Sequence, residues 1–198
     1  MKISLVLFIL LILLACKSKV KDVNITEKTS PIMESNHLPT FDNAHPNAKK
    51  FMADSFFFSP IEETAPFGSD DGSDTYASFQ DWRKTHAHQS LITFLKEHFN
   101  RWNYPMFDIN ETDLEKLKPY LKENEMNTWH MTGIDQAIVA TAFGQLYLEG
   151  KIDNDIKELA IISINRELLP GILKLWRDYE NTRKENLNKL IAVINQVE

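Results

Sequence analysis

A short acidic turn is the part of this sequence whose residue types are best suited to bind a ligand. Residues 67–75 read Phe-Gly-Ser-Asp-Asp-Gly-Ser-Asp-Thr and lead directly into a helical pattern. The carboxylates of Asp70, Asp71 and Asp74 are hard oxygen ligands of the kind that Ca²⁺ prefers. The spacing is not that of an EF-hand, because Ser78 stands where the last Glu of that loop would be.

Three interpretations of this turn stay open at the level of the sequence. As a helix cap, with Ser73 or Asp74 as the N-cap residue, it would satisfy free N–H groups at a site where negative charge contributes about 0.3 to 1 kcal/mol. It could instead form a surface for a partner protein, or hold a cation. We assign Asp70, Asp71 and Asp74 to a cap or a binding surface, and predict no metal site and no cofactor.

Other groups with chemical potential are weaker. The paired carboxylates at 62–63 and 70–71 are of the type used in general acid–base catalysis. His86 and His88 alternate in a loop and offer two nitrogen ligands, although no H-E-x-x-H pattern supports them. No nucleophile elbow, P-loop or dinucleotide fingerprint occurs. The sequence therefore favours a non-enzymatic protein without deciding the question.

The elements that position these residues are predicted to be helices. Apolar residues recur at helical spacing over about 47–54, 73–86, 91–102, 113–121, 131–149, 153–168 and 173–194, and no segment indicates a strand with confidence. The aromatic and Pro-rich stretch from 56 to 67 reads as a small irregular N-terminal lobe, with a short β-hairpin at 56–61 left open. The fold class is mainly α, a compact domain of several helices over residues 45–198.

The segment 131–149 should be the central helix, because it is apolar on nearly every side. Thr132 and Asp135 have the spacing of a capping box, and Gly150 is placed to end the helix in the left-handed conformation. Asp135 and Gln136 are the polar exceptions. They are expected in the first turn as capping groups, with a pocket lining as the alternative.

The first sixteen residues have the pattern of an export signal. Lys2 precedes an apolar run over residues 3–14, which spans roughly 18 Å as a helix against the roughly 30 Å of a bilayer core. Residues 13–16, Leu-Leu-Ala-Cys, resemble the lipobox of bacterial lipoproteins. That resemblance implies that residues 1–15 are removed and that Cys16 is acylated, which would hold the chain on a membrane.

Residues 16–44 are polar, contain two prolines and lack a helical or alternating period, so they are predicted to be a flexible tether. Twenty-nine flexible residues reach roughly 30 Å. Lys17 follows the cysteine in place of the acidic residue that favours inner-membrane retention. The expected location is therefore the cell envelope, on the outer membrane.

Composition excludes several classes. The formal charge is 22 − 28 = −6 and no long basic cluster occurs, so nucleic acid is not an expected partner. A single Cys rules out an intramolecular disulfide framework. Hydrophobic residues at 43% are enough for one globular domain.

Two family resemblances are present. Residues 45–51, Phe56-Phe57 and residues 65–74, through to Trp82, resemble the core signature of the YfeS-like bacterial proteins, and residues 144–150 are compatible with it. The resemblance spans about 45–195 and implies no established activity, so it transfers no catalytic residue. The Phe-Gly-Ser-Asp-Asp-Gly turn is also similar to a turn in SUKH immunity proteins, an α+β family that binds toxins.

These observations predict a lipid-anchored envelope protein that binds another protein, or acts as a structural module, through its aromatic and acidic N-terminal lobe. A metal-dependent envelope hydrolase using the acidic turn from Gly68 to Asp74 is the alternative from a different class. An immunity-type toxin inhibitor is the third.

Overall fold

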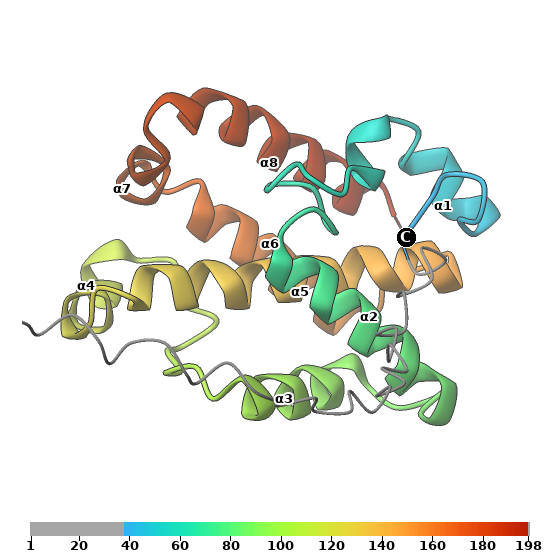
Figure 1. Ribbon diagram of the computed structural model, residues 1–198, viewed down its shortest axis with the longest axis horizontal. Helices are drawn as coiled ribbons and strands as arrows, with labels where there is room; N and C mark the ends of the chain where they lie inside the picture. Colours follow the sequence, from blue (N-terminus) through green and yellow to red (C-terminus); the bar gives the residue numbers. More distant parts are fainter. Residues whose placement is uncertain (1–37, 198) are drawn as a thin grey trace, which may run out of the picture. The chain divides into compact units, whose positions relative to one another are not determined.

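A computed structural model describes residues 38–197 of the chain, and Figure 1 shows how they are arranged. Every regular element among these residues is a helix, which confirms the mainly α fold. The predicted signal peptide, Cys16 and most of the predicted tether lie outside the described residues. Within the described part, no helix has both the length and the apolar character needed to cross a bilayer.

The central helix is α5, Asn127–Glu149, and the other long helices pack around it. Ile134, Ala137 and Phe143 are fully buried on it, as its apolar composition predicts. The helix ends at Gly150 as predicted, because a φ of 74° suits a residue without Cβ.

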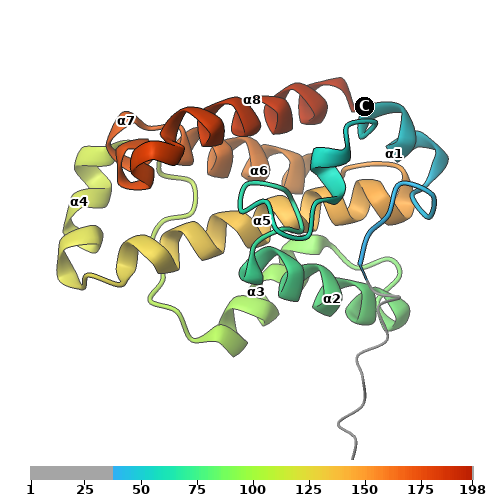
Figure 2. The same cartoon turned by 45° about the horizontal axis from the view of Figure 1, so that its top comes forward.

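Two helices cover one side of α5 in both views (Figures 1 and 2). These are α2, Asp70–Thr85, and α3, Leu91–Trp102. Their contact is aromatic, since the ring centroids of Phe79 and Phe94 are 5.5 Å apart and Trp82 packs on Phe94 at the same distance. Each buried ring of this size contributes roughly 1.5 to 3 kcal/mol.

The opposite side of α5 is covered by α6, Asn154–Glu167, and α8, Glu180–Gln196 (Figure 1). Both have a buried stripe at helical spacing, which includes Ile156 on α6 and Leu190 on α8. The stripe of α6 faces α5 and α8 together, so the three helices share one interior.

The last helix is shorter than predicted. The sequence predicted helix from Leu173 onwards, but the chain passes through α7, Pro170–Leu173, and a 3₁₀ helix η3, Lys174–Tyr179, before α8 begins. Arg177 interrupts the helical path with a φ of 51° and a ψ of −121°. Apolar periodicity does not record such a break, because residues on both sides of it keep helical spacing.

The N-terminal lobe is irregular, as expected, and helical rather than stranded. It contains α1, Pro46–Phe51, and a 3₁₀ turn η2, Ser55–Phe58, so the hairpin left open at 56–61 is not formed. The turn buries Phe57, whose ring stacks on Phe143 of α5 with centroids 5.7 Å apart. Residues 38–44 pack on the same lobe, where the Thr40 N–H donates to the Tyr147 hydroxyl at 3.2 Å.

The remaining helix is α4, Leu114–Glu123, at the N-terminal end of α5. Pro119 lies inside this helix, which continues past it to Glu123. The loop between α3 and α4 returns to the core through Tyr104, Phe107 and Ile109, which pack against the main apolar cluster.

Candidate functional site

The acidic turn forms the start of α2, and its cap is not the predicted one. The hydroxyl of Ser69 accepts from the N–H of Gly72 at 3.0 Å, so Ser69 is the N-cap and neither Ser73 nor Asp74 is. Asp70 and Asp71 stand in the first turn, where negative charge stabilises a helix. Asp74 lies on the helix with its side chain exposed.

Asp71 faces the protein and links α2 to α5. The hydroxyl of Tyr104 donates to its carboxylate at 3.2 Å, and the Tyr104 ring packs on His130 of α5 at 4.6 Å. A Cβ added at Gly133 would collide with the Asp71 carboxylate, so a residue without a side chain is needed for this approach. Burial raises the pKa of Asp71, the Tyr104 hydrogen bond opposes that rise, and the nearby charge of Asp70 adds to it.

The Glu63 carboxylate lies close enough to those of Asp70 and Asp71 for their charges to act on it. The side-chain amide of Gln136 on α5 donates to the Glu63 carbonyl at 3.3 Å and holds this loop over α5. Partial burial raises the pKa of Glu63, and the charges of Asp70, Glu62 and Asp71 raise it further while Arg183 opposes them. We name Glu62, Glu63, Asp70 and Asp71 the acidic rim.

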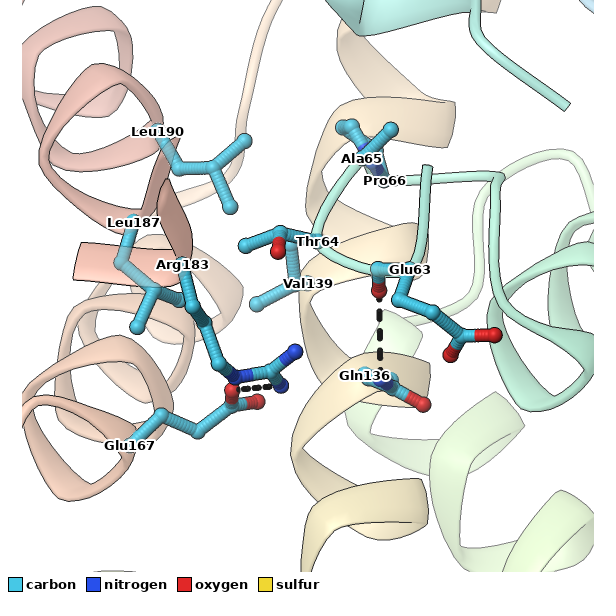
Figure 3. Close-up of a pocket in the computed structure, with 10 residues that line it drawn as sticks. All are labelled: Glu63, Thr64, Ala65, Pro66, Gln136, Val139, Glu167, Arg183, Leu187 and Leu190. Carbon is cyan, nitrogen blue, oxygen red and sulfur yellow. Dashed lines mark hydrogen bonds and ion pairs between the residues drawn. The ribbon is translucent and has the colours of Figure 1, made fainter. Parts of the chain in front are cut away.

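Glu63 of the acidic rim lines a small pocket between the 63–66 loop and helices α5, α6 and α8 (Figure 3). The cavity within its lining has a volume of about 10 Å³. The lining combines apolar walls with a few polar groups: Glu63, Thr64, Ala65, Pro66, Gln136, Val139, Glu167, Arg183, Leu187 and Leu190. Gln136, which sequence analysis placed either in a pocket or at a cap, belongs to the pocket.

Arg183 supplies the charged group of this pocket. Its guanidinium forms an ion pair with Glu167, and both side chains are almost fully buried. The guanidinium carbon lies 3.7 Å from the centroid of the Trp176 ring, a cation–π contact. Nε and Nη1 of Arg183 have no hydrogen-bond acceptor among the described residues, so two of its three nitrogens are unsatisfied.

Aromatic side chains adjoin the same pocket. Trp176 meets Trp129 of α5 edge to face at 5.9 Å, and Trp129 is 55% exposed. The hydroxyl of Tyr179 is 3.1 Å from that of Thr64, which joins η3 to the pocket loop. An exposed Trp beside a buried Arg is a composition enriched in protein interfaces.

Asp135 is not a capping residue, because α5 begins at Asn127 and the Thr132 hydroxyl donates to the Thr128 carbonyl at 3.0 Å. Asp135 is fully buried and pairs with Arg166, whose Nε donates to Oδ2 at 3.0 Å. Burial raises the pKa of Asp135 and the Arg166 charge opposes that rise. The capping-box prediction is wrong because α5 begins before Thr132, so Thr132 and Asp135 lie inside the helix and not at its start.

The sequence pattern did not identify three residues of the buried ion pairs: Arg166, Glu167 and Arg183. A signal for two of them was present, since Glu167 extends the apolar spacing of α6 and Arg183 that of α8. A charged residue on an apolar stripe either has a partner or serves a function. No pattern in the sequence around Arg166 indicates that this residue is buried and paired.

The histidine pair is part of the ordinary surface. The His86 ring stacks on Trp82 at 4.6 Å and His88 is exposed. Over residues 38–197, no three His, Cys, Asp or Glu side chains are grouped closely enough to hold a metal ion. The same residues contain no strand, in contrast to the α+β fold that the SUKH resemblance implies.

Comparison with known proteins confirms the YfeS-like resemblance. The chain is similar to the uncharacterized protein YfeS of Escherichia coli (strain K12), with 24% identity over 140 residues. The match covers 70% of this chain and 56% of that protein, so the chain spans about half the length of the curated relative it matches. No protein-family model matches the chain, and no solved structure matches it significantly.

Proposed function

We propose that this chain is a lipid-anchored protein of the bacterial cell envelope, held on the outer membrane through Cys16, whose helical domain binds another protein. The acidic rim and the exposed Trp129 form the binding surface. The observation that supports the binding function is that one residue of the acidic turn caps the helix while others keep their charges exposed. Ser69 caps α2 with a neutral hydroxyl, which leaves the charges of Asp70 and Asp74 exposed at the surface.

Several features of the surface support a protein as the ligand. Trp129 and Leu175 are more than half exposed, at 55% and 52%, although both are large apolar residues. Trp and Arg carry much of the free energy of protein association, and carboxylates beside them select a partner of opposite charge. The partner surface is therefore expected to present Lys or Arg side chains.

The anchoring half of the proposal is tested in a bacterium that processes lipoproteins. The full-length chain should partition into the detergent phase of Triton X-114, and the Cys16→Ser variant should not be acylated at this position. Mass spectrometry of the purified protein should find Cys16 as the acylated first residue. A chain that keeps residues 1–15, or that carries no lipid, would contradict the proposal.

The binding half is tested by capture from envelope extract with the full-length chain. A variant in which Asp70, Asp71 and Asp74 become Asn should lose the partner that the wild type retains. A matched control removes the same number of carboxylates elsewhere on the helices and should keep the partner: Glu115→Gln, Glu158→Gln and Glu185→Gln. Circular dichroism must show that all three proteins are equally folded. Equal capture by the Asn variant and the control would refute the role of the acidic turn.

A further inference from the structure

The guanidinium of Arg183 is buried with fewer hydrogen bonds than it can make. Its side chain is 1% exposed, it pairs with Glu167, and neither Nε nor Nη1 finds an acceptor among the described residues. Buried donors are nearly always satisfied in native proteins, because leaving one unsatisfied is costly. The unsatisfied nitrogens of Arg183 therefore indicate an acceptor that lies outside the described residues.

The direction of the Arg183 guanidinium and the size of the pocket beside it limit which group can be the acceptor. Figure 3 shows the guanidinium projecting toward the gap between Thr64 and Gln136, on the side away from the body of α8. The ring of Trp176 packs on the guanidinium, so that hydrogen bonding is left to its edge. The cavity volume of about 10 Å³ is far below the roughly 300 to 1,000 Å³ of small-molecule sites, so the pocket has room for one small group of a larger ligand.

The charge around the pocket decides the chemistry of that group. Glu167 already neutralises Arg183, and Glu63 of the acidic rim lines the pocket, close enough to Glu62, Asp70 and Asp71 for their charges to act on it. An anion would be repelled there, whereas a neutral oxygen can accept from Nη1. A cation attached close to that oxygen would be attracted by the rim.

We propose that this pocket receives a main-chain carbonyl oxygen of a bound polypeptide, and that a Lys or Arg side chain next to that carbonyl lies on the acidic rim. The carbonyl accepts from an N–H of Nη1 of Arg183. The proposal rests on the proposed function, because it names the part of the protein partner that this surface recognises.

The test uses the full-length chain in detergent and three synthetic peptides. The probe is acetyl-Ala-Lys-Ala-N-methylamide, and the comparison peptides carry norleucine or Glu in place of Lys. The Nε–H resonance of Arg183 is followed by nitrogen-15 NMR and assigned by its loss in a Glu167→Leu/Arg183→Met double variant. That variant removes both charges together, so that no buried charge is left alone.

The Lys peptide should shift the Nε–H resonance of Arg183. It should bind with a Kd at least about tenfold below that of the norleucine peptide, which corresponds to about 1.4 kcal/mol, and the Glu peptide should bind most weakly. The double variant should bind the Lys peptide at least about tenfold more weakly than the wild type. Glu63→Gln with Asp70→Asn should remove the preference for Lys over norleucine. Glu158→Gln, far from the pocket on the exposed side of α6, should change nothing.

Two results would overturn the inference: an Nε–H resonance that no peptide concentration moves, or a double variant that binds the Lys peptide as the wild type does. Failure of the proposed function looks different. If the double variant still captures the envelope partner and the triple Asn variant does not, the binding function stands and the role of Arg183 falls. If the triple Asn variant captures it too, the acidic surface falls, and the peptide titration still decides the pocket.

Discussion

Two buried ion pairs meet at neighbouring residues of α6 and differ in how completely they are satisfied. Arg166 donates to Asp135 and, through Nη1, to the carbonyls of Ile109 at 3.0 Å and Glu111 at 2.7 Å. Its guanidinium also lies 4.8 Å from the Phe107 ring. Glu167, the next residue, pairs with Arg183, in which two nitrogens have no acceptor among the described residues.

The difference separates a structural role from a binding role. Arg166 uses its donors inside the protein and fixes the loop between α3 and α4 to the core. Arg183 is as deeply buried but leaves donors directed into a pocket. Burial and charge are nearly equal in the two pairs, so hydrogen-bond satisfaction is the property that distinguishes them.

The largest expected effect is at the satisfied pair. Arg166→Met leaves the Asp135 carboxylate buried without its partner and should lower the free energy of unfolding by about 3 to 5 kcal/mol, measured by urea denaturation. Lys84→Met removes a cation from an exposed pair with Asp81 and should cost less than about 1 kcal/mol. If the two variants are equally stable, Arg166 is not a structural clamp.

His98 extends the comparison to a third buried polar group that is fully bonded. Arg101 can only donate, so Nδ1 accepts from it at 2.9 Å, and Nε2–H donates to the Thr75 hydroxyl at 3.0 Å. Burial, with the Arg101 charge adding to it, lowers the pKa of His98 to about 4. The folded state resists protonation, and the unfolded state, with a pKa near 6.5, does not.

The sign of the pH dependence follows from that difference. The stability that His98 contributes is fully present above pH 6.5 and is lost as the pH falls toward 4, because the unfolded state then binds the extra proton. Between pH 7 and pH 5 the loss should be about 2 kcal/mol. Urea denaturation at both pH values should show this loss in the wild type and its absence in His98→Gln. An equal pH dependence in both proteins would assign the titration to other groups.

In the acidic turn, too, one residue has a structural role and another a binding role, and smaller changes in the free energy of unfolding are expected there. Ser69→Ala removes the hydrogen bond to the Gly72 N–H and should lower the free energy of unfolding by about 1 kcal/mol. Asp70→Asn removes an exposed charge in the first turn and should cost about 0.3 to 1 kcal/mol. Thermal unfolding ranks the two. A larger loss for Asp70→Asn would mean that the carboxylates hold the helix and are not reserved for binding.

The smallest effect on stability is expected at the unsatisfied pair. Replacing Glu167 by Leu and Arg183 by Met together removes two desolvated charges and two unsatisfied donors, so the free energy of unfolding should stay within about 1 kcal/mol of the wild type. Urea denaturation provides the check. A loss of several kcal/mol would make this pair a structural clamp like that of Arg166 and would remove the contrast between them.

Local patterns in the sequence determined the helical fold, because they depend on neighbours along the chain. The apolar surround of α5, the left-handed end at Gly150 and the amphipathic spacing of α3 were all predicted and are all present. The break at Arg177 was not predicted, since the residues on both sides of it keep helical spacing. Asp135 was predicted to be a capping residue for the same reason, because spacing along the chain does not show which residues meet in the fold.

The candidate site was only half determined by the sequence. The turn containing Asp70, Asp71 and Asp74 was visible, because three carboxylates in a short turn are a local feature. Its neighbours were not visible. Asp135 and Arg166 are 31 positions apart, and the pocket joins the loop at Glu63 to Arg183 on the last helix. Only tertiary packing decides which buried charges meet, because a charge removed from water needs a partner and the partners here are distant in the chain.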